Sequence, residues 1–577
     1  MTTPTTDDRT AAATRRRLEA LADEAWHGSL DADPLYATAI GDRGRLAALP
    51  PNDEGARDRE HSRLGDLVAR VSAIGDEELA APDRITKAAL LDFLDYELRL
   101  RSSAIDRWTV DQMDGPQVGL LNVPSYQPIA TIAEGAAAVE RWRAMGPWID
   151  RHVAAISKAA QEGLVAPRAN VASVIDELDD VLDQPDAAWP LLGPATVDHP
   201  DWPADELSRF RVGLADAVRD SVRPAFGRFR ALLTDEILPR SRPDTESGLC
   251  HVPGGEAAYA DLVRAHTTLP LDAMAIHRIG LGEVERIDAE FAELGADLLG
   301  ARGTAATIER LRTDPALRFS TSGEVLAIGE GALRRATDAV PAWFGRVPTA
   351  PCEVVVMEPH ESKHSTIAYY RQPSADGGRP GQYYLNTTLP ETRPRYEAEC
   401  LAFHEAVPGH HLQIAIAQEL EGLPAFQRFA GPTAFIEGWA LYTERLCDEM
   451  GIYSGAIDRF GILSFDAWRA CRLVVDTGLH AFGWSRDRAI AYMVEHTALA
   501  ENNVVNEVDR YVALPAQALA YKSGQLEIVR LRREAESALG DHFDIRAFHD
   551  AVLGDGAVGL ATLRTIVGSW TESVRSG

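Results

Sequence analysis

Apolar residues recur at every third or fourth position along most of this 577-residue chain, which is the spacing of one face of an α-helix. The pattern is longest in "RFRVGLADAVRDSVRPAFGRFRALLTDEIL". There we expect one long helix or a helix pair, kinked near Pro224 because proline has no amide hydrogen to donate. Its apolar stripe consists of Phe210, Leu214, Val218, Val222, Phe226, Phe229, Leu233 and Ile237. Similar stripes cover residues 14–28, 85–102, 134–162, 257–265, 271–294 and 325–340. The sequence therefore predicts a mainly α fold.

One stretch, residues 351–388, has the composition of β-structure instead. "CEVVVME" is a run of β-branched residues, and "IAYYRQPSADGGRPGQYYLNTT" has two aromatic segments around a Gly/Pro/Asp loop. The second pattern predicts a hairpin. Helical patterns resume at about residue 391, so we expect a small sheet inside an otherwise helical protein.

Charge and composition exclude several classes of partner. The formal net charge is −29, whereas nucleic-acid binding needs a basic surface. The N-terminal "MTTPTTDDRTAAATRRRLEA" lacks the apolar core of a secretory signal, and no run approaches the roughly 18 apolar residues of a membrane span. The five cysteines are scattered without a C-x-x-C pair, as in reduced proteins. We expect a cytoplasmic protein with no nucleic-acid or membrane partner.

The segment "FHEAVPGHHLQ", residues 403–413, has the features of an interrupted zinc helix. The common zinc helix is H-E-x-x-H, with both histidines on one face. Here Pro408 occupies the place of the second histidine, and His410 and His411 follow it. On an ideal helix His410 would lie about 9 Å along the axis from His404 and about 120° off its face, too far to share an ion. An irregular turn at Pro408-Gly409 would bring one of the later histidines back.

A carboxylate on a later helix completes a candidate metal site. Glu437 lies in "FIEGWALYTE", an apolar and aromatic segment where an unpaired carboxylate would be costly to bury. A bound cation would remove that cost. The candidate ligands are therefore His404, Glu437 and either His410 or His411.

Four ordered segments make the chain similar to a known family. "HEAVPGHHLQ", "FIEGWALYTE", "RLVVDTGLHAFGWSRDRAIAYM" and "RYVALPAQALAYKSGQLEI" together resemble the family catalogued as domain of unknown function 885, which is grouped with the zincin-like (gluzincin) metallopeptidases. The resemblance implies a gluzincin-like helical fold with a deep central cleft. We expect residues 1–14 to be disordered, residues 15–345 to form one cleft wall, and residues 346–577 to form the catalytic region.

The resemblance also implies one Zn²⁺ per chain, although other divalent metals would accept the same ligands. "HEAVPGHHLQ" looks like the H-E-x-G-H-x-Q of peptidyl-dipeptidase-like zincins with two inserted residues. That alignment makes His404, His410 and Glu437 the ligands, with His411 as the alternative or a supporting residue. Glu405 would be the general base that takes a proton from the attacking water and passes it to the leaving amine.

A hydrogen-bond donor for the tetrahedral oxyanion is expected from a late helix. Tyr521 is the candidate and Tyr511 the competitor, and a buried core tyrosine is the alternative for each. The family usually has Pro-Gly-Gln ahead of Tyr521, whereas this chain has Ala516 in the glycine position, which leaves the local backbone angle open. His480 is a further catalytic candidate that could line the site or form a structural hydrogen-bonding pair with Asp476.

Substrate contacts are expected from the hairpin and from the late helices. An exposed strand edge can pair with an extended peptide, although ordinary packing of the hairpin is the alternative. The hairpin candidates are Tyr369, Tyr384 and Asn386. The late candidates are Tyr511, Gln517 and Lys522, with Lys522, Arg472 and Arg510 as cations for a substrate carboxylate.

Together these features predict a zinc-dependent hydrolase of peptide or amide bonds that acts on short peptides. Two alternatives stay open: a dedicated amide hydrolase for one small peptidic metabolite, and an inactive zincin-fold protein that binds peptides. Glu405 disfavours the inactive protein, since binding needs no general base. The sequence leaves the oligomeric state open.

Overall fold

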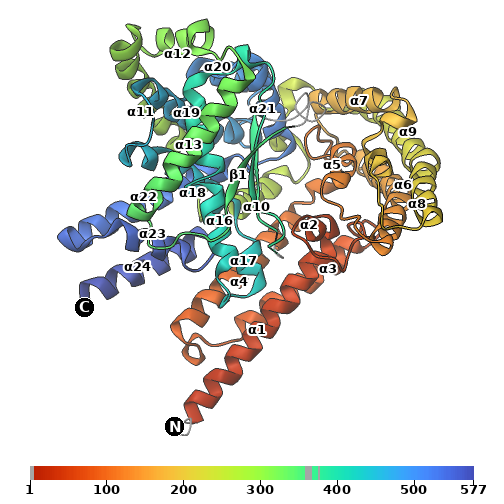
Figure 1. The fold of residues 1–577 in the computed structure, drawn as a ribbon, viewed down its shortest axis with the longest axis horizontal. Helices are drawn as coiled ribbons and strands as arrows, with labels where there is room; N and C mark the ends of the chain where they lie inside the picture. Colours follow the sequence, from red (N-terminus) through yellow and green to blue (C-terminus); the bar gives the residue numbers. More distant parts are fainter. Residues whose placement is uncertain (1–5, 358–366, 375–376, 577) are drawn as a thin grey trace.

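The computed structural model describes residues 6–357, 367–374 and 377–576, and helices dominate it (Figure 1). The mainly α fold is therefore confirmed. Helix α1 begins at Thr6, so the disorder expected over residues 1–14 is wrong for residues 6–14, while residues 1–5 lie outside the described residues. The acidic residues at the start of α1 and the alanines and arginines that follow favour a helix there.

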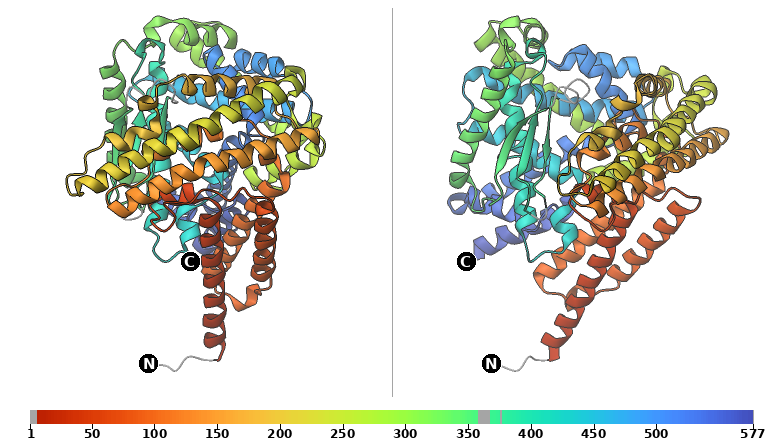
Figure 2. Two further views of the ribbon diagram at one scale, coloured as in Figure 1. Left: turned by 90° about the vertical axis from the view of Figure 1, so that its right-hand side faces the viewer. Right: turned by 45° about the vertical axis from the view of Figure 1, so that its right-hand side comes forward.

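The N-terminal helices form an arm that projects from the body of the molecule (Figures 1 and 2). They are α1 (Thr6–Ala32), α2 (Pro34–Ala39), α3 (Ala56–Ser72) and α4 (Ala81–Ser103). The apolar faces of α1, α3 and α4, which include Leu18, Leu64 and Leu90, are buried in the largest hydrophobic cluster. The arm is thus part of the main core and not a separate unit.

A second group of helices stacks on the side of the molecule away from α11 and α12 (Figures 1 and 2). It contains α5 (Pro116–Asn122), α6 (Ile132–Gln161), α7 (Arg168–Leu182), α8 (Ala204–Ala217) and α9 (Arg223–Leu232). The predicted stripe from Phe210 to Ile237 is buried here. The irregularity expected near Pro224 takes the form of a wider π turn over residues 218–222, which accommodates a residue that cannot donate to the preceding turn.

The small sheet follows four more helices. These are α10 (Gly255–Thr267), α11 (Ala273–Leu299), α12 (Thr304–Thr313) and α13 (Ser322–Trp343). The sheet has the order β1-β3-β2, with strands β1 (Cys352–Val356), β2 (Ala368–Arg371) and β3 (Gly381–Leu385). Because β2 and β3 are antiparallel neighbours, the predicted hairpin is confirmed, and β1 adds in parallel to β3.

Helices make up the remainder of the chain. They are α15 (Ala398–Glu405), α16 (His410–Glu419), α17 (Ala425–Phe429), α18 (Thr433–Glu449), α19 (Arg459–His480), α20 (Arg486–His496), α21 (Glu501–Ala513), α22 (Leu519–Leu539), α23 (Ile545–Leu553) and α24 (Leu560–Ser576). No helix in the described ranges combines the length and the apolar composition needed to cross a membrane. All five cysteines are unpaired, and three of them are buried.

Hydrophobic packing does not follow the boundary expected at residue 345. The largest cluster joins α1, α3, α4 and α13 to α15, α18 and the C-terminal helices. Another joins α11 to α19, α20 and α21. The buried residues of a third all lie within residues 110–237, with Leu35 and Leu49 packed against them, so this group is smaller than the predicted N-terminal region.

Helices α18 and α22 cross in close contact at two glycines. A Cβ on Gly524 would lie 1.8 Å from the carbonyl oxygen of Ala434, and a Cβ on Gly438 would lie 2.5 Å from the Cα of Gly524. Neither position has room for a side chain. The crossing brings the α18 residue Glu437 and the α22 residue Tyr521 to the same region of the molecule.

We predict that Gly524→Ala destabilises the protein by about 1–3 kcal/mol, because an added methyl group overpacks the crossing. The measurement is the midpoint of urea unfolding. Gly568→Ala is the matched control, since its Cβ would meet nothing within 4 Å on the exposed side of α24. It should leave the midpoint unchanged or raise it. Equal midpoints for the two variants would contradict a close crossing.

Candidate metal centre

The interruption predicted in the histidine segment is present. Helix α15 ends at Glu405 and α16 begins at His410, so four residues lie between them. The Val407–Pro408 peptide in this interval is cis. A Cβ on Gly409 would lie 1.9 Å from the carbonyl oxygen of His404. Only glycine lets the two backbone segments approach this closely.

The interruption brings His404 and His410 to one carboxylate. The Nε2 atoms of both histidines lie 3.5 Å from Oε2 of Glu437, which comes from α18. One potential ligand atom of each residue lies within 4.8 Å of the others. The two imidazole rings are nearly perpendicular, at 84°. The structure therefore places the three predicted ligands together.

This arrangement fits a divalent cation. Two ligand atoms held tetrahedrally at about 2.0–2.1 Å from zinc lie about 3.3–3.4 Å apart, close to the measured separations. The same contacts are too long for good hydrogen bonds. Oε2 of Glu437 is buried and has no hydrogen-bond partner in the part of the chain that the structure describes. Two imidazoles and one carboxylate also form the ligand set of known catalytic zinc sites.

Helix α18 supplies two further residues that fix the geometry. Nδ1 of His404 hydrogen-bonds Oε1 of Glu444 at 2.8 Å, which directs Nε2 toward the cluster. Nε1 of Trp439 donates to the carbonyl of Pro408 at 3.0 Å and holds the interrupted turn against α18. Neither residue is among those predicted from the sequence. Glu444 could have been found, because it lies two helical turns after Glu437 on the same face.

The electrostatics of the cluster also favour a cation. Burial lowers the pKa of His404, but Glu437 and Glu444 outweigh burial and raise the pKa to about 9. Burial raises the pKa of Glu437, but His410 and His404 outweigh it and hold that pKa well below its usual range. Without metal, a proton on His404 balances the buried carboxylates. Metal binding would displace that proton and would therefore weaken as the pH falls.

Glu405, the predicted general base, follows His404 directly and is partly exposed. Its carboxylate has no hydrogen-bond partner within the described segments. It lies near the buried hydroxyl of Tyr383, whose pKa is raised by burial and then by Glu405. The Glu405 carboxylate is therefore accessible and is not held by neighbouring side chains of the described residues.

Tyr521 lies beside the cluster, as predicted for an oxyanion donor. Burial raises its pKa, Glu437 raises it further, and Arg472 and Arg510 lower it. Gln517 lies close enough to the Tyr521 phenol to lower its pKa, and it accepts a hydrogen bond from Nη1 of Arg510 at 3.0 Å. Gln517 is therefore placed to orient Tyr521.

Tyr511 does not have the free hydroxyl that a substrate contact requires. It is buried, and its hydroxyl donates to Oε2 of Glu507 at 2.6 Å. The Tyr511 hydroxyl oxygen accepts hydrogen bonds from Trp468 and Arg472 at 3.0 and 2.9 Å. Tyr511 is therefore a buried core tyrosine, and the substrate contact predicted for it is wrong.

His411, the alternative ligand, points away from the cluster. Nε2 of His411 donates to the carbonyl of Ala350 at 3.0 Å, so Nδ1 of the neutral ring accepts from the Tyr370 hydroxyl at 3.0 Å. Burial lowers its pKa to about 4. Both nitrogens are used in fixing α16 to the sheet, which excludes His411 as a ligand in this geometry.

His480 is a structural residue, and the catalytic role predicted for it is wrong. Its Nδ1 accepts from the Leu249 N–H at 3.1 Å, and its Nε2 donates to the Tyr511 carbonyl at 3.0 Å. Burial lowers its pKa to about 3. Asp476 binds the backbone separately, by accepting from the N–H of Ala516, which has a left-handed φ of 68°. That turn is where the family's glycine would be expected.

Lys522 is also unavailable to a substrate. Its ammonium group is almost fully buried between the carboxylates of Asp466 and Glu283 and hydrogen-bonds Gln525 at 2.8 Å. A buried lysine requires such partners. The role predicted for Lys522 as a cation for a substrate carboxylate is therefore wrong.

The hairpin candidates are engaged in packing. Tyr369 and Tyr384 stack on each other, with ring centroids 4.7 Å apart. Because side chains alternate along a strand, the histidine segment faces Tyr370 instead. Asn386 is buried, and its side-chain oxygen accepts from the N–H of Thr388 at 3.1 Å. Ordinary packing of the hairpin, the alternative to substrate contact, explains the positions of all three candidates.

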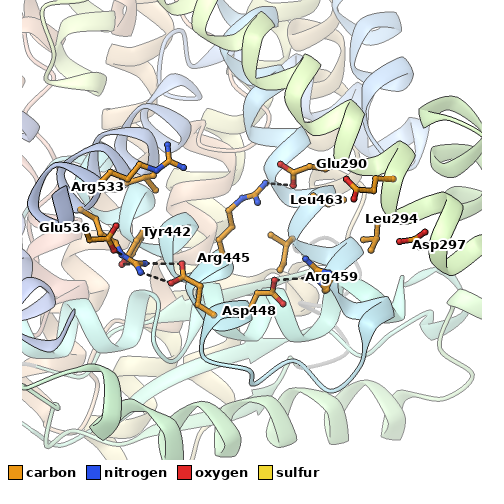
Figure 3. Close-up of a pocket in the computed structure, with 15 residues that line it drawn as sticks. Glu290, Leu294, Asp297, Tyr442, Arg445, Asp448, Arg459, Leu463, Arg533 and Glu536 are labelled. Atoms are coloured by element: carbon orange, nitrogen blue, oxygen red, sulfur yellow. Dashed lines mark hydrogen bonds and ion pairs between the residues drawn. The ribbon is translucent and has the colours of Figure 1, made fainter. Parts of the chain in front are cut away.

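A cavity of about 510 Å³ lies elsewhere, between α11, α18, α19 and α22 (Figure 3). Ion pairs cross it, including those from Arg445 to Glu290 and from Arg459 to Asp448. None of the three cluster residues lines it. This cavity is therefore not the predicted central cleft, which stays a prediction.

Fold and site together define a mainly helical protein with a buried His-His-Glu cluster beside a small sheet. The chain belongs to the family described as bacterial protein of unknown function (DUF885), whose model matches residues 34–567. The family expected from the four motifs is thus confirmed. No curated protein matches the chain.

Two solved structures have the same fold. One is a candidate lipoprotein from Colwellia psychrerythraea, with a TM-score of 0.89 and 28% identity over 97% of this chain and 99% of that chain. The other is a candidate lipoprotein of unknown function from Shewanella oneidensis, with a TM-score of 0.71 and 16% identity over 95% of this chain and 98% of that chain.

Glu444→Gln should weaken zinc binding by about 10–100-fold, because the amide holds His404 less firmly and makes its imidazole less basic. Competition with a chelating dye measures the affinity. Glu449→Gln on the same helix is the control, since Glu449 pairs with Arg532 away from the cluster. Equal affinities for both variants would show that Glu444 does not support a bound metal.

His410→Ala should remove the metal, whereas His411→Gln should retain about one ion per chain. Elemental analysis after dialysis measures this difference. His411→Gln is expected to lower the unfolding midpoint, because it disturbs the contacts to Ala350 and Tyr370. Metal loss in a folded His411→Gln variant, with metal retained by His410→Ala, would reverse the assignment.

Proposed function

We propose that the chain is a zincin-like metallohydrolase that cleaves peptide or amide bonds in short peptides. The observation that carries the proposal is the convergence of His404, His410 and Glu437, with the free carboxylate of Glu405 directly beside a ligand. These three side chains would hold one zinc ion, which when bound polarises a carbonyl group and lowers the pKa of water.

Side chains of the protein carry out the remaining steps. Glu405 takes the proton of the attacking water and delivers it to the nitrogen of the leaving amine. The Tyr521 phenol, oriented by Gln517, donates to the oxyanion that forms on the substrate carbonyl. Its raised pKa keeps the phenol protonated, which a donor requires. Glu444 keeps His404 in the orientation that binding needs.

The central cleft is part of this proposal. Glu405, Glu437 and Tyr521 are partly exposed, whereas His404 and Trp439 behind them are buried. This pattern supports access from one side only. Walls made of packed helices would admit a short or unfolded peptide and exclude a folded protein.

A cytoplasmic location is also part of the proposal. The five unpaired cysteines support it. Both solved relatives are described as candidate lipoproteins, a description that concerns those proteins. Fractionation of the native cells would decide whether this chain is anchored as well.

Two alternatives are separated by substrate breadth and by turnover. A dedicated amide hydrolase would cleave one small acylated amine and ignore a random peptide library. An inactive peptide-binding protein would cleave nothing, but the unpaired carboxylate of Glu405 disfavours it, since a binding protein gains nothing from leaving that group free.

Glu405→Gln should keep the zinc ion and lower turnover of a peptide library by about 10²–10⁴-fold, because the amide cannot accept a proton. Mass spectrometry of the products and elemental analysis measure both effects. Tyr521→Phe should lower kcat by about 10²–10³-fold with the metal retained. Glu421→Gln, in the exposed turn after α16, is the control and should behave as the wild type.

A zinc-loaded wild-type protein that cleaves neither the library nor acylated amines would overturn the proposed function. Unchanged turnover in Glu405→Gln would show that Glu405 is not the general base. It would not contradict the proposed hydrolase activity.

A further inference from the structure

Behind Tyr521, two buried guanidinium groups share a single ion-pair partner among the described residues. We call Arg469, Arg472 and Arg510, from α19 and α21, the arginine cluster. Nη2 of Arg472 and Nη2 of Arg510 both lie 3.0 Å from the same oxygen of Glu507. Within the described residues, Glu507 is the only carboxylate that pairs with either of these two guanidinium groups. Two cations therefore share one anion.

Several donors of the arginine cluster are left without partners. Nη1 of Arg472, Nε of Arg510, and Nε and Nη1 of Arg469 are buried and have no hydrogen-bond acceptor among the residues that the structure describes. Arg472 is only 2% exposed. An unsatisfied N–H of a buried charged group is costly. An anion bound at this place would remove the cost.

The unpaired donors lie next to the metal site. The guanidinium carbon of Arg472 lies 4.3 Å from the centre of the Tyr521 ring. Tyr521 is close enough to Glu437 to interact with its charge, and Gln517 links Tyr521 to Arg510. The Tyr521 ring thus neighbours both Arg472 and the candidate ligand Glu437.

We propose that the arginine cluster binds the free C-terminal carboxylate of a peptide, so that cleavage occurs near the C-terminus of the substrate. The proposal rests on the proposed function. Guanidinium groups match carboxylates by paired hydrogen bonds. The C-terminal carboxylate is the one anion that every short peptide carries close to its last amide bonds, whatever its side chains. Lys522, by contrast, is fully paired and contributes nothing to this subsite.

The test compares each peptide as the free acid and as the C-terminal amide. With the zinc-loaded wild type, the free acid should have a KM at least tenfold lower, and mass spectrometry should find products released from the C-terminal end. Calorimetry with the Glu405→Gln variant should show the same tenfold preference in binding. The ligand pair needs no substitution in the arginine cluster, so misfolding cannot produce the result.

Arg510→Met should remove the preference by raising KM for the acid about tenfold or more, to the KM of the amide, and should lower kcat for both peptides equally because Gln517 loses its contact with Arg510. Its side chain is 11% exposed, which makes it the more tolerant position of the two that share Glu507. Arg533→Met, on the exposed face of α22, is the matched control and should keep the wild-type preference.

Each outcome decides a separate point. Equal KM and equal binding for acid and amide, with cleavage of both, would overturn the carboxylate subsite and leave the hydrolase standing. Tighter binding of the acid without any cleavage would support the subsite and overturn the proposed function. A preference for acidic side chains over the free terminus, or no binding of either peptide, would overturn the subsite.

Discussion

Two imidazoles separated by six positions can meet one carboxylate only if the helix between them stops and starts again. In this protein the stop occurs at Pro408-Gly409, where the chain passes so close to its own preceding turn that a side chain on Gly409 has no room. Trp439 holds the turn by its indole N–H, and the rest of the site depends on that geometry.

Helix α18 organises the centre from the other side. It presents Glu437 to both histidines and Glu444 to the outer nitrogen of His404, and it approaches α22 through a glycine contact. Because these residues share one rigid helix, the carboxylate ligand, the support of His404 and the clamp on the interrupted turn are positioned together. Tyr521 joins them because the glycine contact lets α22 pass close by.

Buried charge in this protein follows two patterns. Around Asp466, the ammonium of Lys522 and the guanidinium of Arg445 are satisfied by carboxylates, which is the arrangement of a structural ion network. At the metal cluster and the arginine cluster, buried polar atoms have no partner among the residues that the structure describes. The proposed ligand sites coincide with two of these groups of unsatisfied atoms, whereas Lys522 is fully paired and has no donor left for a ligand.

The sequence by itself determined the helical class, the hairpin, the break in the histidine helix and the candidates His404 and Glu437, and it left the choice between His410 and His411 open. Each of these depends on local periodicity, on proline and glycine chemistry, or on the cost of a lone buried carboxylate. Only the tertiary structure decided the roles of His411, His480, Tyr511 and Lys522. These four side chains are chemically as suitable for catalysis or binding as those of the site. They differ because their polar atoms already form hydrogen bonds or ion pairs with backbone or charged groups of distant elements. Such partners are brought in by packing between elements far apart in the chain, which no local pattern records.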